Sequence, residues 1–231
     1  MKRERWREVK IKIAPAIMDA DLGHLADAIA ELEEAGADLL HVDVMDGHFV
    51  PAFVGGTRVV AAVKRNATIP VGVHLMVANP DQAVPWFLDA GADTIFFHPE
   101  ATDDAAEVVR RIQRAGRMAG LALKPEVPAR SIEHVAAELD CIVAMTVNPG
   151  FSGQGFIESG CAKIPALRRM CKPGIDIYVD GGINPETAPV AIRYGANVLA
   201  VASAVFAADV SPGEAVKRLR RIAENVSRAK D

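Results

Sequence analysis

Apolar runs alternate with amphipathic stretches along the chain, and this alternation predicts strands separated by helices. Eight apolar runs have the strand pattern: Val9–Ile17, Asp38–Met45, Val71–Met76, Thr94–His98, Met118–Lys124, Cys141–Val147, Ile175–Asp180 and Val198–Ser203. They are rich in Val, Ile, Leu and Ala, which is typical of parallel strands covered on both faces. Leu22–Ala35 and Ala105–Ala115 are examples of the helical stretches between them.

A short phrase around a glycine recurs after predicted helices and indicates a repeat of one strand plus one helix. It occurs at Ala35–Asp38, Ala90–Asp93, Ala115–Gly116 and Tyr194–Asn197. Spacings near multiples of about 26 residues allow eight such units to fill most of the chain. We therefore predict an α/β fold with a single (β/α)8 TIM barrel domain over residues 1–231, with residues 1–8 as a flexible N-terminal extension. A doubly wound open sheet shares the alternation but rarely needs eight units.

Composition and charge restrict the function classes. The net charge of -4 gives no indication of a nucleic-acid or anionic-membrane partner. The N-terminus is charged and lacks the apolar core of a signal peptide, and no apolar run reaches the roughly 18 residues of a spanning helix. Three cysteines without Cys-x-x-Cys spacing, Cys141, Cys161 and Cys171, predict reduced thiols in a cytoplasmic protein.

Polar residues gather at the ends of three predicted strands, where a barrel places its functional groups. Strand alternation puts His41 and Asp43 on one face, while His74 and Asp180 end the third and seventh strands. Two imidazoles and two carboxylates suit one divalent metal ion, with Zn²⁺ favoured and Fe²⁺, Mn²⁺ or Co²⁺ as alternatives. A hydrogen-bonded core residue is the better interpretation of one isolated histidine. Four such groups in an apolar barrel mouth would need costly pairing, which favours the metal.

Three methionines lie two residues beyond inward positions: Met45, Met76 and Met145. They are either ordinary core residues or a soft cap that excludes water from the metal, and the pattern alone does not choose.

Glycine-rich loops after the last three strands predict a phosphate site. The loop after the sixth strand contains Gly150, Phe151, Ser152 and Gly153. Gly181 and Gly182 follow the seventh strand, and Ala202 and Ser203 follow the eighth. Such loops leave backbone N–H groups free for an anion, and barrels of this kind usually bind phosphate there. Each glycine pair alone is weak evidence, because glycine is also a turn residue.

These motifs resemble the ribulose-phosphate 3-epimerase family. The matching segments are Ile13–Met18, His41–Pro51, Val73–Val77, Val147–Phe151 with Gly153–Gln154, and Val179–Asn184. The resemblance implies a barrel of the ribulose-phosphate-binding type. It also implies an epimerase that inverts carbon 3 of a ketose phosphate through a metal-stabilised enediolate, converting D-ribulose 5-phosphate to D-xylulose 5-phosphate. The implied partner is this small molecule, and members of the family often form homo-oligomers.

The resemblance also implies roles for individual residues. The matches to the family's metal ligands are His41, Asp43, His74 and Asp180, of which the two aspartates match its acid/base pair. The family holds the substrate phosphate at the positions matched by Gly150, Gly153, Gly182 and Ser203. It has a methionine cap at the positions matched by Met45, Met76 and Met145.

Four positions depart from the family's pattern, and all four lie around the sugar or its phosphate. Ala16 replaces a usual Ser, Ala52 a common Asn, Ser152 a common Gly, and Ala202 the Gly of a Gly-Ser pair. We therefore predict that the reaction type is kept while the substrate or the efficiency can differ. D-Allulose 6-phosphate is the alternative substrate, because His98–Glu100 and Met145–Val147 resemble that branch of the family.

Two other function classes stay open. A decarboxylase or aldolase on a related barrel would rely on a catalytic lysine in an Asp-x-Lys cluster, but His41–Asp43 lacks one and only Lys124 ends a strand. A non-catalytic sugar-phosphate-binding barrel is the second class. The presence of both aspartates and both histidines argues against it.

Overall fold

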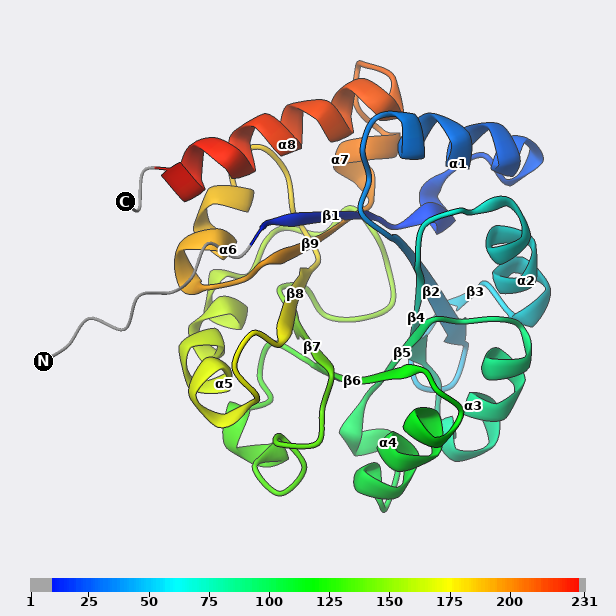
Figure 1. Ribbon diagram of the computed structural model, residues 1–231, viewed down its shortest axis with the longest axis vertical. Helices are drawn as coiled ribbons and strands as arrows, with labels where there is room; N and C mark the ends of the chain where they lie inside the picture. The colour runs from blue at the N-terminus through cyan, green and yellow to red at the C-terminus, as the bar shows by residue number, and fades with distance from the viewer. Residues whose placement is uncertain (1–9, 229–231) are drawn as a thin grey trace, which may run out of the picture.

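The computed structural model describes residues 10–228, in which parallel strands form a ring inside a layer of helices (Figure 1). The strands follow the order β1-β9-β8-β7-β6-β5-β4-β2-β3, and a parallel bridge between Ala16 and His41 joins β1 to β2. The ring is therefore closed, which confirms the predicted (β/α)8 barrel and excludes the open sheet. The predicted extension over residues 1–8 lies outside the described residues.

The eight predicted strands are all present: β4 has its predicted bounds, β2 begins and ends later than predicted, and the other six are shorter. They are β1 (Lys12–Pro15), β2 (Leu40–Asp46), β4 (Val71–Met76), β5 (Thr94–Phe97), β6 (Met118–Leu123), β7 (Cys141–Met145), β8 (Asp176–Asp180) and β9 (Val198–Val201). The helices are α1 (Leu25–Glu34), α2 (Thr57–Asn66), α3 (Pro80–Asp89), α4 (Ala105–Arg114), α5 (Ile164–Met170), α6 (Ala188–Tyr194), α7 (Ser203–Phe206) and α8 (Pro212–Arg228). Short 3₁₀ turns include η1 (Ile17–Asp19), and between β6 and β7 the turn η4 (Ala129–Ile132) stands where other units have an α-helix.

One strand was not predicted. The two-residue strand β3 (Phe53–Val54) pairs antiparallel with the end of β2. The turn between them begins at Asp46, whose carboxylate accepts hydrogen bonds from the backbone N–H groups of His48 and Phe49, both at 2.8 Å. This hairpin extends β2 beyond the barrel, and two residues are too few to show an alternating pattern.

The recurring glycine phrase has two physical functions. Its glycines have positive φ, for example +89° at Gly36 and +108° at Gly195, which allows each helix to end in a tight turn. The polar residue at its end then accepts a hydrogen bond from the backbone N–H of the preceding strand. Asp38 bonds Ile13 at 2.8 Å, and Asp93 bonds Val71 at 2.9 Å. Asn197 makes the same bond with Ile177. Asp140, which precedes β7 without such a glycine phrase, makes it with Ala119.

Phe96 of β5 fills the inside of the barrel. It is fully buried in a cluster of inward-facing side chains: Ala14, Leu39, Phe96, Ala122, Cys141, Val143, Met145, Tyr178 and Val198. Its ring lies 4.8 Å from Tyr178 and 6.0 Å from His41, measured between centroids. Glycines on the neighbouring strands leave room for it, because a Cβ on Gly72 or Gly120 would come within 3.1 or 2.6 Å of the ring.

The outer layer closes where the last helix meets the first. The backbone N–H of Gly213 in α8 donates to Glu31 of α1 at 2.8 Å, and the two helices lie side by side in Figure 1. Within residues 10–228, no helix combines the length and apolar character needed to cross a bilayer. Cys141, Cys161 and Cys171 are buried and unpaired.

Gly120→Ala is expected to destabilise the fold by about 1–3 kcal/mol, because the added methyl group overpacks the inside of the barrel. The methyl would meet Phe96 at 2.6 Å and the Cys141 sulfur at 2.7 Å. Gly155→Ala is the control, since nothing lies within 4 Å of that position. Urea unfolding of both variants checks this prediction, and equal midpoints would contradict it.

Candidate functional site

Four predicted side chains meet at the carboxyl ends of β2, β4 and β8. One ligand atom from each of His41, Asp43, His74 and Asp180 lies within 4.8 Å of the others. The pairing register explains the convergence, because Asp43 lies opposite His74 in the β2–β4 ladder. Asp180 comes from the far side of the ring, where it lies opposite Met145 on β7.

The nitrogen atoms of both histidines are aimed at the carboxylates. His74 Nδ1 lies 3.2 Å from Asp43 Oδ1 and 3.3 Å from Asp180 Oδ2. His41 Nε2 lies 3.3 Å from Asp43 Oδ1 and 3.8 Å from Asp180 Oδ2. The histidine side chains are fully buried, whereas those of Asp43 and Asp180 keep 18% and 15% of their surface exposed. The carboxylates therefore form the accessible layer of the cluster.

His41 shows that this arrangement fits a divalent metal ion. Both of its ring nitrogens are buried and have no hydrogen-bond partner. A buried polar atom without a partner is costly, and an ion between His41 Nε2 and the carboxylates would satisfy it. The donor set of two nitrogens and two oxygens is one that Zn²⁺, Fe²⁺, Mn²⁺ and Co²⁺ all accept.

The electrostatics of the cluster favour charged groups. Burial opposes ionisation of Asp43, but His41 and His74 outweigh it and hold the pKa of Asp43 well below its usual range. Burial likewise lowers the pKa of His74, while hydrogen bonds with Asp180 and Asp43 raise it to about 9. A carboxylate that stays anionic, as the low pKa of Asp43 indicates, is what a cation requires of its ligand.

Thr146 fixes the end of β8 and was missed by the sequence analysis. Its backbone N–H donates to the carbonyl of Asp180 at 2.8 Å, and its buried hydroxyl donates to the carbonyl of Gly181 at 2.5 Å. These bonds hold the backbone that carries the Asp180 carboxylate. A threonine at the end of a strand gives no sequence pattern that separates this function from ordinary packing.

The three predicted cap methionines lie at the same end of the barrel. Met45 and Met76 are opposite each other in the β2–β4 ladder, and Met145 is opposite Asp180. Met76 and Met145 are buried, while Met45 is half-buried. Their position fits both interpretations, because Met145 also belongs to the inner cluster around Phe96.

The predicted phosphate loops pack against one another. Gly181 and Gly182 have φ of +109° and +66°, and a Cβ at either would strike Val147 or the backbone of Phe156. Both positions therefore require glycine. Gly150, at φ +131°, lies against Val50 of the β2–β3 hairpin. Loops from β2, β7 and β8 thus surround the opening.

The positions that depart from the family's pattern gather at this opening. The Ala16 N–H donates to the Val201 carbonyl at 2.9 Å, which places Ala16 beside the strand end that precedes Ala202 and Ser203. The side chain of Ser152 lies near the carboxylate of Asp19 and favours its ionised form. Desolvation raises the pKa of Asp19, and repulsion from Asp43 adds to this rise. Asp19 therefore adds a third carboxylate to the mouth.

Lys124, the one lysine considered for a decarboxylase, lies outside the four-residue cluster. Its Nζ pairs with Glu100 at 3.1 Å and lies 4.3 Å above the Phe49 ring.

Two phenylalanines are exposed beside the mouth loops. Phe151 has 59% of its surface accessible and Phe53 has 83%.

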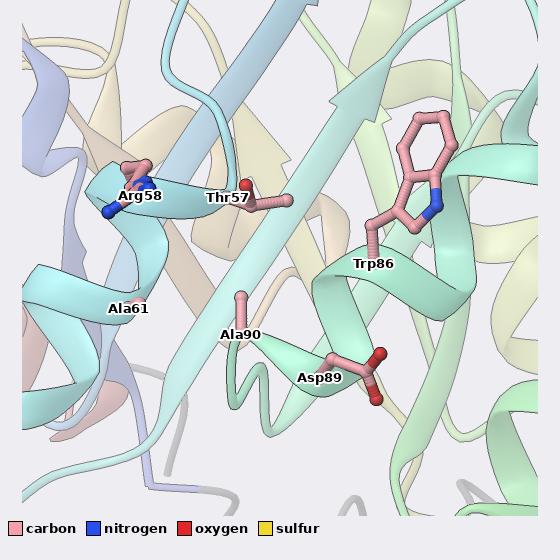
Figure 2. Close-up of a pocket in the computed structure, with 6 residues that line it drawn as sticks. All are labelled: Thr57, Arg58, Ala61, Trp86, Asp89 and Ala90. Carbon is pink, nitrogen blue, oxygen red and sulfur yellow. The ribbon is translucent and has the colours of Figure 1, made fainter.

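Two surface pockets lie outside the cluster. Figure 2 shows the first, a groove of about 430 Å³ between α2 and α3 with Trp86 and Asp89 on one wall and Arg58 on the other. The second, of about 710 Å³, is lined by residues that include Phe49, Glu100 and Lys124. Neither groove contains a residue of the four-residue cluster.

Comparison with known proteins agrees with the geometry. Residues 12–206 match the model of the "Ribulose-phosphate 3 epimerase family". The chain is 46% identical to a ribulose-phosphate 3-epimerase of Bacillus subtilis, over 85% of this chain and 92% of the relative. It is 45% identical to the enzyme of that name from Methanocaldococcus jannaschii, over 92% of this chain and 91% of the relative.

Solved structures with low sequence identity share the fold. Orotidine 5'-phosphate decarboxylase from Pyrococcus horikoshii superimposes with a TM-score of 0.68 at 18% identity, covering 92% of this chain and 99% of that one. A 3-hexulose-6-phosphate synthase gives a TM-score of 0.67 at 21% identity with the same coverage. These likenesses support the barrel and carry no information on the reaction.

The stability of the metal-free protein is expected to fall as the pH rises from about 6.5 to 9. His74 has a pKa of about 9 in the folded chain and an ordinary value of 6.5. A raised pKa stabilises the fold fully below 6.5, and that contribution is lost as the pH rises through 9. Thermal unfolding in chelator, compared with His74→Gln at each pH, isolates the effect. A constant difference between the two proteins would contradict it.

Proposed function

The chain belongs to the ribulose-phosphate 3-epimerase family of carbohydrate isomerases, and we propose that it inverts carbon 3 of D-ribulose 5-phosphate to give D-xylulose 5-phosphate. The observation that carries this proposal is the pair of partly exposed carboxylates, Asp43 and Asp180, that come from opposite parts of the ring beside two buried histidines. The substrate name comes from the relatives, and the reaction type rests on this geometry.

Inversion next to a ketone needs a base on one face of the carbon and an acid on the other. One aspartate removes the C3 proton, which leaves a planar carbon, and the other returns a proton from the opposite side. A single carboxylate reaches one face only. Asp43 and Asp180 supply the two required positions, and each such group contributes roughly 10²–10⁴ in rate. The reverse reaction exchanges their functions.

His41, Asp43, His74 and Asp180 would hold one divalent metal ion, with Zn²⁺ favoured by the mixed nitrogen and oxygen donors. Bound there, the ion would act as a Lewis acid that stabilises negative charge on the ketone oxygen and acidifies the C3 proton. This matters because the pKa of Asp43 is low, which makes it a weak base. The two buried histidines hold the carboxylates in place, and His74, which lies beside both carboxylates, is also expected to contact the substrate.

The loops around the mouth would bind the other end of the substrate. We propose that backbone N–H groups near Gly150, Gly153, Gly181 and Gly182 hold the phosphate, with Phe151, Ser152, Ala202 and Ser203 beside it. The close packing of Gly181 and Gly182 on Val147 and Phe156 supports a preformed site. Met45, Met76 and Met145 would exclude water above the ligand cluster, where an apolar wall strengthens every charge interaction.

Each Asp→Asn variant is expected to lose epimerisation by about 10²–10⁴-fold while keeping half of the proton chemistry. Asp43→Asn leaves Asp180 able to exchange the C3 hydrogen of one epimer with solvent deuterium, and Asp180→Asn leaves Asp43 able to exchange that of the other. NMR of D-ribulose 5-phosphate and D-xylulose 5-phosphate in D₂O measures this directly.

Metal content is the control for these variants, because both aspartates are also proposed ligands. A variant that keeps its metal and still exchanges both epimers would contradict the two-aspartate mechanism. Release of CO₂ would indicate a decarboxylase, and a wild-type protein that performs no exchange on any ketose phosphate would indicate a binding protein.

Ala16→Ser is expected to raise kcat/KM for D-ribulose 5-phosphate by about 2- to 10-fold, the equivalent of one hydrogen bond. The family's serine hydroxyl is missing at a buried position next to the strand end that precedes Ala202. The control is Ala115→Ser, an exposed change at the opposite end of the barrel. Rates with D-allulose 6-phosphate and shorter ketose phosphates complete the series. A wild-type preference for D-allulose 6-phosphate would reassign the substrate.

A further inference from the structure

A third histidine contacts the ligand cluster and has no part in the proposed reaction. His98 follows β5 and is fully buried. Its Nε2 lies 3.1 Å from Nε2 of His74, and the two ring centroids are 5.2 Å apart. On its other side the His98 ring packs on Phe49, with centroids 4.8 Å apart. His98 is thus held between a metal-ligand candidate and an aromatic wall.

The 3.1 Å contact between the two Nε2 atoms is a hydrogen bond, in which one nitrogen donates its N–H and the other accepts with its lone pair. Two N–H groups would repel at this distance, and two lone pairs would leave both buried atoms unsatisfied. The Nδ1 atom of His74 is the one aimed at Asp43 and Asp180. A neutral imidazole that binds a cation through Nδ1 carries its proton on Nε2. His98 Nε2 is therefore the acceptor in this contact.

We propose that His98 is a positioning residue for the metal site: it accepts the hydrogen bond from His74 Nε2–H and so makes His74 present Nδ1 to the ion. This inference rests on the proposed metal site at the strand ends. Partners of this kind fix the tautomer and the ring orientation of a metal-binding histidine. The ion is the same divalent cation as in the proposed function. What is added is that His98 determines which nitrogen of His74 binds that ion.

The contact on the other side of the His98 ring, between Nδ1 and Glu100, agrees with a hydrogen bond donated by His74 to His98. With Nε2 as acceptor, its proton lies on Nδ1, which has no hydrogen-bond partner and lies 3.7 Å from the Glu100 carboxylate. Glu100 is held by Lys124 at 3.1 Å, and Lys124 is held over the Phe49 ring. A carboxylate beside an N–H favours that tautomer electrostatically. The chain of contacts runs from the cluster through His98 to Glu100, which lines the 710 Å³ surface pocket.

If His98 served only to fill space, the site would require the shape of its ring against Phe49. The Nε2 atom that faces His74 would then be unimportant. His98→Phe keeps a flat ring in that place and removes the acceptor. His98→Gln loses the ring, but its amide oxygen can accept from His74 while its amide nitrogen donates toward Glu100. The two variants therefore separate shape from hydrogen bonding.

Zinc affinity, measured by competition with a chromophoric chelator, is the first test. His98→Phe is expected to bind Zn²⁺ about 10- to 100-fold more weakly than wild type, and His98→Gln to recover most of this loss. The absorption spectrum of the Co²⁺-loaded proteins is expected to change in His98→Phe and to resemble wild type in His98→Gln. Wild-type affinity in His98→Phe, or equal weakening in both variants, would overturn the proposal.

The second test needs no variant and so does not depend on how well the substitutions fold. In Zn²⁺-loaded wild-type protein, long-range ¹H–¹⁵N NMR of the histidine rings is expected to show the proton of His74 on Nε2 and that of His98 on Nδ1. The opposite tautomer at either ring would overturn the proposal. Wild-type protein that binds no zinc would instead remove the metal site itself, which distinguishes the two failures.

Discussion

Burying two imidazoles and two carboxylates in the mouth of an apolar barrel is the constraint on which the rest of this structure depends. Such groups are costly to remove from water unless each has a partner. Asp43 and Asp180 face the histidine nitrogens, and His41 keeps both of its own without a hydrogen bond. The protein alone therefore leaves the cluster unsatisfied, and a divalent cation would complete it. The proposed metal affinity and the proposed catalytic geometry would then arise from the same four side chains.

The surrounding layers keep this cluster in one arrangement. Thr146 holds the backbone of Asp180, and His98 borders His74. Below them, Phe96 fills the barrel next to His41, in space that Gly72 and Gly120 leave open. The Phe96 ring cannot move further into the barrel without leaving a cavity. The side chains of the cluster cannot rotate without breaking a buried hydrogen bond. Rigidity at this depth leaves the mouth loops as the part of the site where substrate preference can vary.

The sequence predicted the barrel and the convergence of four polar side chains at the strand ends, because both depend on local periodicity. Alternation along β2 and β4 places His41, Asp43 and His74 on one face without any tertiary information. The strand β3 was missed because two residues carry no periodicity. The function of Thr146 was not predicted because it depends on which group lies opposite that residue on the neighbouring strand. The contact between Asp19 and Ser152 joins loops more than a hundred residues apart, and no local pattern reports such a contact.

The three aspartates and the asparagine that precede four of the strands have a consequence for how the barrel forms. Asp38, Asp93, Asp140 and Asn197 each tie their own strand to the one before it, over separations of only 20 to 25 residues. The bonds join β1 to β2, β4 to β5, β6 to β7 and β8 to β9, which divides the ring into four consecutive quarters. Each quarter can set its own strand register early, because closing a short loop costs little entropy. The long-range step of folding is then the joining of four preformed pieces. The cluster of His41, Asp43, His74 and Asp180 forms only when the first, second and fourth pieces have met.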